Sequence, residues 1–292
     1  MQKLKVKSAG QKLKLFIFSF LVIFLVLSSY FLFINRRILA DETNSDNQIK
    51  TATVAPSQTP NFADLSWPSG QTIDAPILMY HHVGALLADA DDIRRGLTVS
   101  AEDFETQMKF LKDNSYDVLT LAEMYGAVAK DSPLQKSVVL TFDDGYTDNF
   151  DVARPILQKY GFKGTFFIIS GKIGESEYMN EAQIRELAKA GNEIGSHSVS
   201  HPDLANLSDA KVKTEVEKSK ADLEALAGQK IISFCYPAGK FATSVEKILE
   251  MAGYKIAVTT KKWQPFSTDK PFEVPRYRIN PGTSLKNLLS SF

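Results

Sequence analysis

Two adjacent carboxylates at the end of an apolar run are the first residues whose positions could do chemistry. Asp143 and Asp144 follow residues 138–142 and precede Gly145. Successive side chains of an extended chain point in opposite directions, so the two acids can serve different purposes. Because a buried carboxylate is costly without a cation or hydrogen bonds, we predict that one binds a metal ion and the other is a base. An Asp-Gly turn or a helix cap explains the dipeptide alone equally well.

Two histidines four residues apart could supply further metal ligands. His197 and His201 would lie on one face if residues 197–201 form a helical turn, as in zinc-type sites. With one aspartate they would make a three-ligand site that keeps an open position for water. Two unrelated surface histidines are the alternative. The chain has four histidines, and the other two, His81 and His82, are adjacent.

Taken together, these motifs resemble a known enzyme family. Thr141-Phe-Asp-Asp-Gly145 and His197-Ser-Val-Ser-His201 are similar to the first two motifs of the NodB-type polysaccharide deacetylases, carbohydrate esterase family 4. Ser233-Phe-Cys-Tyr-Pro-Ala-Gly239 is similar to the third motif, and the likeness extends over residues 73–292. It is greatest to the branch that resembles poly-N-acetylglucosamine and peptidoglycan deacetylases. The resemblance implies an α/β fold, a distorted (β/α) barrel, and metal-dependent removal of acetyl groups from N-acetylated sugars.

The resemblance also implies a role for each matching residue. Asp144, His197 and His201 would bind one divalent metal ion, and Asp143 would be the general base that takes a proton from the attacking water. The backbone N–H of Ala238 would stabilise the oxyanion. Two imidazoles and a carboxylate suit zinc, cobalt or nickel, and we expect zinc.

Three positions depart from the family pattern. Cys235 stands where the third motif usually has an arginine that partners the base, and Ala238 stands where it has an aromatic residue. No histidine follows His201 to serve as the general acid. We predict that Arg276 replaces the missing arginine. A solvated pair of Arg276 with Arg278 on a strand edge is the alternative.

His81 is the candidate for the missing general acid. It follows the apolar run 77–80, so its side chain would lie at the same end of the predicted strands as the other motifs. An imidazole suits proton donation to the leaving amine near neutral pH. The alternative is a hydrogen-bonded core histidine. Four aromatic residues near strand ends could stack on sugar rings or simply pack, namely Tyr146, Tyr178, Trp263 and Tyr277.

Alternating strands and helices must position these residues. Strands are predicted at residues 77–80, 138–142, 165–169, 231–236 and 256–259, where β-branched and aromatic residues cluster. Helices are predicted to begin at Ser100, Asn180, Ser208 and Ser244. This alternation favours a parallel sheet, closed as a barrel or doubly wound, with its chemistry at the carboxyl ends of the strands.

The N-terminal residues have a different composition. Residues 1–14 are basic, residues 15–34 carry no charge, and residues 35–72 are rich in polar residues and proline. We predict a cytoplasmic segment, a transmembrane anchor of about 30 Å and a flexible linker to a domain at 73–292. The lysines before the anchor place the catalytic domain outside the cell membrane. A cleaved signal peptide, which would release the domain, is the alternative.

Charge and cysteine content exclude several classes of function. The 34 basic and 34 acidic residues balance, but seven basic residues and no acid lie in residues 1–40, so the remainder carries a net charge of −7. This argues against a nucleic-acid partner. A single cysteine excludes an intrachain disulfide and a multi-cysteine metal site. The expected partners are an N-acetylated polysaccharide and the membrane, with no protein partner evident. An O-acetyl sugar esterase and an inactive glycan-binding module are the alternative functions.

Overall fold

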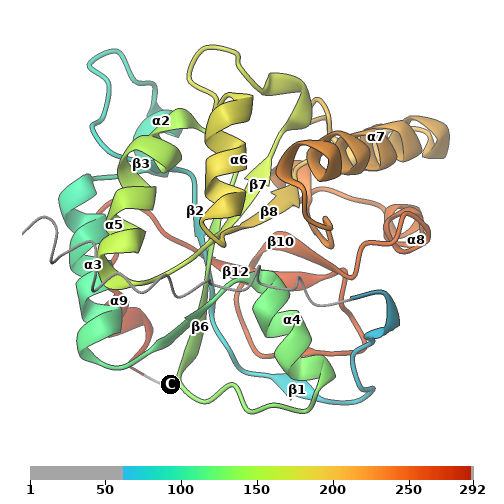
Figure 1. Ribbon diagram of the computed structural model, residues 1–292, viewed down its shortest axis with the longest axis horizontal. Helices are drawn as coiled ribbons and strands as arrows, with labels where there is room; N and C mark the ends of the chain where they lie inside the picture. Colours follow the sequence, from blue (N-terminus) through green and yellow to red (C-terminus); the bar gives the residue numbers. More distant parts are fainter. Residues whose placement is uncertain (1–61, 291–292) are drawn as a thin grey trace, which may run out of the picture. The chain divides into compact units, whose positions relative to one another are not determined.

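The computed structural model describes residues 62–290 (Figure 1). The predicted cytoplasmic segment 1–14, the anchor 15–34 and the linker as far as residue 61 lie outside this range. Within residues 62–290, no helix combines the length and the apolar character needed to cross a bilayer.

Seven parallel strands close into a barrel. The sheet runs in the order β2-β12-β10-β9-β8-β7-β6, and β6 pairs with β2 to close it, while β5 pairs beside β6. The strands are β2 (Ile77–Tyr80), β5 (Asp117–Leu119), β6 (Ser137–Phe142), β7 (Thr165–Ile168), β8 (Glu193–Ser196), β9 (Ser233–Cys235), β10 (Ile256–Lys262) and β12 (Val274–Arg278). The predicted distorted (β/α) barrel is therefore confirmed.

Helices connect the strands and surround the barrel (Figure 1). They are α2 (Asp92–Leu97), α3 (Ala101–Asp113), α4 (Leu121–Ala129), α5 (Arg154–Tyr160), α6 (Glu181–Lys189), α7 (Asp209–Ala227), α8 (Thr243–Met251) and α9 (Leu285–Leu288). A π-helix, η2 (Asn149–Ala153), precedes α5, and the 3₁₀ turns are η1 (Phe62–Asp64), η3 (Ser170–Lys172), η4 (Leu204–Asn206) and η5 (Pro237–Gly239). Short strands form two further pairs, β1 (Thr72–Ile73) with β11 (Phe266–Ser267) and β3 (His82–Val83) with β4 (Thr98–Val99).

Side-chain capping explains two of the four predicted helix starts. The side chains of Ser100 and Asn180 accept hydrogen bonds from backbone N–H groups of the first turns of α3 and α6. Ser208 is the N-cap of α7. The predicted start of α8 at Ser244 is wrong by one residue, because the helix begins at Thr243 with Ala242 at the N-cap.

Strand alternation divides the apolar side chains into two clusters. Leu78, Val138 and Leu140 belong to a cluster that includes the surrounding helices. Ile77 and Val139, their neighbours along the strands, belong to a second cluster with interior residues of the other strands and with α4. Because side chains alternate across a strand, residues two apart along β6, β9 and β12 share the barrel interior.

The folded unit begins before the predicted boundary at residue 73. Phe62 is buried in the cluster that contains α4. The Trp67 ring stacks on Tyr125 at a centroid distance of 5.2 Å, and its Nε1–H donates to the Tyr125 carbonyl at 3.1 Å. Residues 62–72, which composition assigned to the linker, therefore pack as part of the domain.

A buried carboxylate ties α4 to the start of the barrel strands. Glu193 accepts hydrogen bonds from the Ala122 N–H, the Thr165 hydroxyl and the Ser233 hydroxyl at 2.6–2.8 Å. Burial raises the pKa of this carboxyl, and the three hydrogen bonds only partly oppose that rise. The folded state therefore binds a proton more tightly than the unfolded state does.

Replacing this carboxyl with an amide should change the pH dependence of stability. As pH rises above about 4.3, the ordinary glutamate value, the unfolded state loses its proton first and the free energy of unfolding falls. Glu193→Gln keeps a hydrogen-bonding side chain without this titration. We expect the difference in the free energy of unfolding, Glu193→Gln minus wild type, to increase as the pH rises. Urea denaturation of both proteins between pH 4 and 8 measures this difference. The exposed control Glu102→Gln should show no such trend. A pH-independent difference for Glu193→Gln would contradict the expectation.

Candidate active site

Asp143 and Arg276 form a buried ion pair at the carboxyl end of the barrel. The guanidinium contacts both carboxylate oxygens, with Nη1 2.7 Å from Oδ1 and Nη2 2.8 Å from Oδ2. Its remaining N–H groups donate to the Thr141 hydroxyl at 2.9 Å, the Thr259 carbonyl at 3.0 Å and the Cys235 sulfur at 3.2 Å. All five donors of the guanidinium therefore have acceptors. The alternative of a solvated Arg276 is wrong.

This ion pair keeps Asp143 ionised. Burial by itself would raise the pKa of the carboxyl, but the charge and hydrogen bonds of Arg276 outweigh it and hold the pKa well below its ordinary value. A carboxylate in this state can accept a proton at neutral pH. Arg276 thus lies where a partner of the predicted base must be, whereas Arg278 is exposed.

The small side chain of Cys235 leaves space for the Asp143–Arg276 ion pair and contacts both residues. Its sulfur lies 3.5 Å from Asp143 Oδ2, as a thiol donor, and accepts from Arg276. Burial raises the pKa of the thiol, which keeps it protonated. The residue is a small buried side chain in the barrel interior, where the Arg276 side chain occupies the adjoining space.

Asp144, His197 and His201 come together as a candidate metal site. Asp144 Oδ1 lies 3.4 Å from His197 Nε2 and 3.6 Å from His201 Nε2. Ligand atoms about 2.1 Å from a tetrahedral zinc ion lie about 3.4 Å from one another, so the spacing fits such an ion. His197 Nδ1 is 2.7 Å from the Cys235 carbonyl, to which it donates, and this leaves Nε2 free to bind a metal.

The two histidines converge from a loop, so the predicted helical turn at residues 197–201 is wrong. Ser198 and His201 have φ values of +65° and +58°, outside a right-handed helix. The carboxylate of Glu215, on α7, accepts from the N–H groups of Val199 and Ser200 at 2.9 Å. These hydrogen bonds hold the loop so that the histidine ring centroids lie 4.7 Å apart.

His81 reaches the base from the end of β2. Its Nε2 lies 3.9 Å from Asp143 Oδ2, and its side chain is 11% exposed. Burial lowers the pKa of the ring, against the opposing charges of Asp143 and Asp144. The buried, hydrogen-bonded histidine is its neighbour His82, whose Nδ1 lies 2.8 Å from Asp148 Oδ2. His81 thus lies near the predicted base, and its role as the proton donor stays a prediction.

Ala238 is exposed and lies in η5, three residues after the end of β9. It has a φ of +52°, and the next residue, Gly239, also has a positive φ. A Cβ at Gly239 would lie 2.0 Å from the Thr260 hydroxyl, so only glycine fits there. Glycine at position 239 therefore specifies the shape of this turn, and the oxyanion role that the family resemblance implies for the Ala238 N–H stays a prediction.

All four aromatic residues that could stack on sugar rings or simply pack contact other rings of the protein, and the Tyr178 ring lies 5.2 Å from that of Tyr146. The Tyr146 ring stacks on His82 at a centroid distance of 3.6 Å, and the Trp263 ring stacks on Tyr277 at 5.0 Å. One face of each ring is thus covered by protein. These contacts favour packing for Tyr146 and Trp263.

Several residues of the site were missed by sequence reasoning. Thr141 accepts from Arg276, the Cys235 carbonyl orients His197, and Asn149 Nδ2 donates to the His81 carbonyl at 2.7 Å. Thr141 is part of the first motif, and this position in the sequence could have indicated that it belongs to the site. The other two contacts join strands and loops far apart in sequence.

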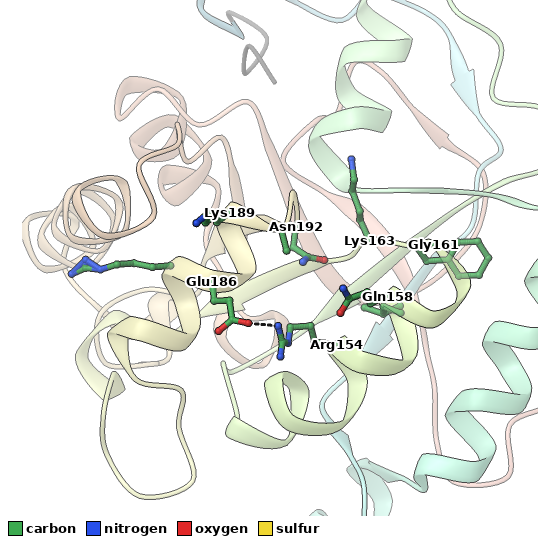
Figure 2. A pocket seen from close by; sticks show the side chains of 11 residues that line it. Arg154, Gln158, Gly161, Lys163, Glu186, Lys189 and Asn192 are labelled. Atoms are coloured by element: carbon green, nitrogen blue, oxygen red, sulfur yellow. Dashed lines mark hydrogen bonds and ion pairs between the residues drawn. The ribbon is translucent and has the colours of Figure 1, made fainter. Parts of the chain in front are cut away.

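A pocket of about 860 Å³ between α5 and α6 contains none of these residues. Figure 2 shows Arg154 and Glu186 paired across it, with Lys163 and Lys189 at its edges. The predicted chemistry thus lies elsewhere, at the carboxyl ends of the strands.

Comparison with known proteins gives consistent matches. The family described as polysaccharide deacetylase matches residues 130–257. YxkH of Bacillus subtilis (strain 168), which carries the polysaccharide deacetylase name, is 35% identical over 210 residues, 72% of each chain. A poly-beta-1,6-N-acetyl-D-glucosamine N-deacetylase of Staphylococcus aureus (strain MSSA476) is 27% identical over 64% of this chain and 69% of that protein. The structure of the Streptococcus pyogenes deacetylase PplD in complex with acetate has a TM-score of 0.69 at 33% identity, covering 75% of this chain and 98% of PplD.

Proposed function

This chain belongs to the polysaccharide deacetylase family, and we propose that it is a metal-dependent hydrolase of N-acetyl groups. The substrate would be a cell-envelope or extracellular polysaccharide that contains N-acetylglucosamine. The observation that carries this proposal is that two adjacent aspartates have different partners. Asp143 is paired with Arg276, while Asp144 faces His197 and His201.

The relatives support the choice of substrate. A similar Staphylococcus aureus protein is named for N-deacetylation of poly-beta-1,6-N-acetyl-D-glucosamine, and the similar structure of PplD was solved with acetate. Acetate is the acid that hydrolysis of an acetyl group releases. We therefore favour an N-acetylated glucosamine polymer as the substrate.

The residues of the chain would divide the reaction among them. A divalent ion, zinc before cobalt or nickel, would polarise the acetyl carbonyl and lower the pKa of the attacking water when held by Asp144, His197 and His201. Asp143 would take the proton of that water, and His81 would donate a proton to the leaving nitrogen. The N–H of Ala238 would donate a hydrogen bond to the oxyanion.

We also propose where the reaction takes place. Residues 15–34 form an uncharged run that follows a lysine-rich segment. An anchor of this kind would hold the catalytic domain at the outer face of the cell membrane. The polar residues that follow would let the domain reach glycan a short way from the bilayer.

Acetate release tests the proposed function. The full-length chain, stripped of metal with a chelator, should release acetate from N-acetylglucosamine oligomers only after zinc or cobalt is restored. Asp144→Ala should reduce release to the background rate, because one of three ligands is lost. The surface variant Asp113→Ala should behave as the wild type.

Two other results would replace the proposal. Acetate from O-acetylated but not N-acetylated sugars would indicate an O-acetyl esterase. No acetate from either, with one metal ion bound per chain, would indicate an inactive glycan-binding module.

A further inference from the structure

The histidine loop, residues 197–201, carries two of the three proposed metal ligands and is held on two sides. On one side it pairs with the backbone of η3. The Ser198 carbonyl accepts from the Ser170 N–H at 3.1 Å. The Val199 carbonyl accepts from the Gly171 N–H at 2.8 Å. On the other side, the donors of the loop meet a single carboxylate, that of Glu215.

Glu215 accepts three hydrogen bonds from the histidine loop. Its Oε2 accepts from the N–H groups of Val199 and Ser200, both at 2.9 Å, and its Oε1 accepts from the Ser200 hydroxyl at 2.8 Å. Hydrogen bonds to an ionised acceptor are stronger than those between neutral groups. Glu215 lies on α7, where Val212 and Val216 are fully buried in the core. Packing of the helix therefore holds this carboxylate in place.

The conformation of the histidine loop is one that its own residues disfavour. Ser198 and His201 both have left-handed φ values, and a side chain makes this region of the backbone costly. Ser198 Oγ accepts from the His201 N–H at 3.0 Å, but this contact lies within the loop. Contacts from outside, such as those of Glu215, must therefore hold the loop in this conformation.

His201 depends on the loop backbone more than His197 does. The His197 side chain is 3% exposed, and its Nδ1 donates to the Cys235 carbonyl, so burial and a hydrogen bond both orient this ring. The His201 side chain is 34% exposed. Its ring lies against His197, and its Nε2 is 3.6 Å from Asp144 Oδ1, so its contacts are with the other proposed ligands. The position of the loop thus decides whether His201 Nε2 reaches them.

We propose that Glu215 is a positioning residue, which fixes the histidine loop so that His201 completes the metal site before the ion arrives. The inference rests on the proposed function, because it concerns the metal site of that enzyme. A ligand on a mobile loop must be ordered when the ion binds, and this ordering weakens the affinity. Hydrogen bonds from α7 remove part of that cost beforehand. Loss of such outer partners typically weakens metal affinity or activity by 10–100-fold.

Glu215→Ala is the test, because it removes all three hydrogen bonds and leaves the proposed ligands in the chain. The dissociation constant for Co²⁺ alone would be measured on the metal-free full-length chain by competition with a chromophoric chelator. We expect it to rise by about 10–100-fold. Circular dichroism of the metal-free protein checks that the variant is folded at the temperature of the titration.

Two further variants separate the shape of the loop from the charge of the residue. Glu215→Gln is uncharged, but its amide oxygen can accept from the backbone N–H groups and its amide nitrogen can donate to the Ser200 hydroxyl. We therefore expect Glu215→Gln to bind Co²⁺ more tightly than Glu215→Ala does. Glu217→Ala removes a carboxylate from the exposed face of the same helix, where it pairs with Lys213 at 3.7 Å. This control should bind Co²⁺ as the wild type does.

The outcomes distinguish failure of this inference from failure of the proposed function. Wild-type protein that binds no Co²⁺ would overturn the metal-dependent function, and with it the role of Glu215. Wild-type protein that binds Co²⁺, with the same affinity in Glu215→Ala, would overturn only the positioning role. Equal weakening in Glu215→Gln and Glu215→Ala would assign the effect to charge and would contradict the proposal. A Glu215→Ala chain that does not fold would make the residue a support of the whole domain, which also contradicts it.

Discussion

Replacing Arg276 with methionine should abolish acetate release and lower the free energy of unfolding by about 3–5 kcal/mol. The substitution leaves the buried Asp143 carboxylate without its bidentate partner. Burial, which raises the pKa of Asp143, would then be unopposed by the guanidinium, and the base would be lost as a proton acceptor near neutral pH. Acetate assays and urea denaturation of the full-length chain measure the two effects.

Two further arginine substitutions sharpen this test. Arg278→Met removes an exposed arginine from the same strand and should leave both stability and acetate release near wild type. Arg276→Lys keeps the charge but cannot make the paired hydrogen bonds, so it should restore stability more than turnover. Wild-type turnover in Arg276→Met would show that Asp143 needs no such partner.

Replacing His81 with alanine should lower acetate release from N-acetylglucosamine oligomers by about 10²–10⁴-fold while the metal ion stays bound. Nitrogen is a poor leaving group until it is protonated. His81 is the imidazole whose Nε2 lies 3.9 Å from Oδ2 of the proposed base Asp143. The three proposed metal ligands are other residues, so metal content should match the wild type. Metal analysis and steady-state kinetics on the same preparation check both expectations.

The leaving group gives this experiment its internal control. An aryl acetate ester releases a phenolate that needs no protonation, so His81→Ala should hydrolyse it at a rate near that of the wild type. An equal loss on ester and amide would show that His81 acts in a step other than protonation of the leaving group. Normal turnover of the amide would exclude His81 as the general acid.

The local part of the fold followed from residue pattern. The run 138–142 and the caps Ser100 and Asn180 contain their information within a few residues, because strand alternation and helix capping are short-range. The turn at 197–201 was misjudged because its shape depends on Glu215, a residue of α7 that accepts hydrogen bonds from the loop backbone. Neighbouring residues in the sequence do not encode that contact.

By itself, the sequence determined the kinds of chemical groups and their place at strand ends. Asp143, Asp144, His197 and His201 could be named because a metal ligand or base requires particular side chains at short spacings. Only the tertiary structure decided between the two interpretations of Arg276, a partner of the predicted base Asp143 or a solvated residue on a strand edge. Closure of the barrel brings β12 beside β2, and the register of the strands places the buried Arg276 against Asp143, while Arg278, the last residue of β12, is exposed. The partners are 133 positions apart in the sequence, so no local signal indicates their contact, which depends on the register of the closed sheet.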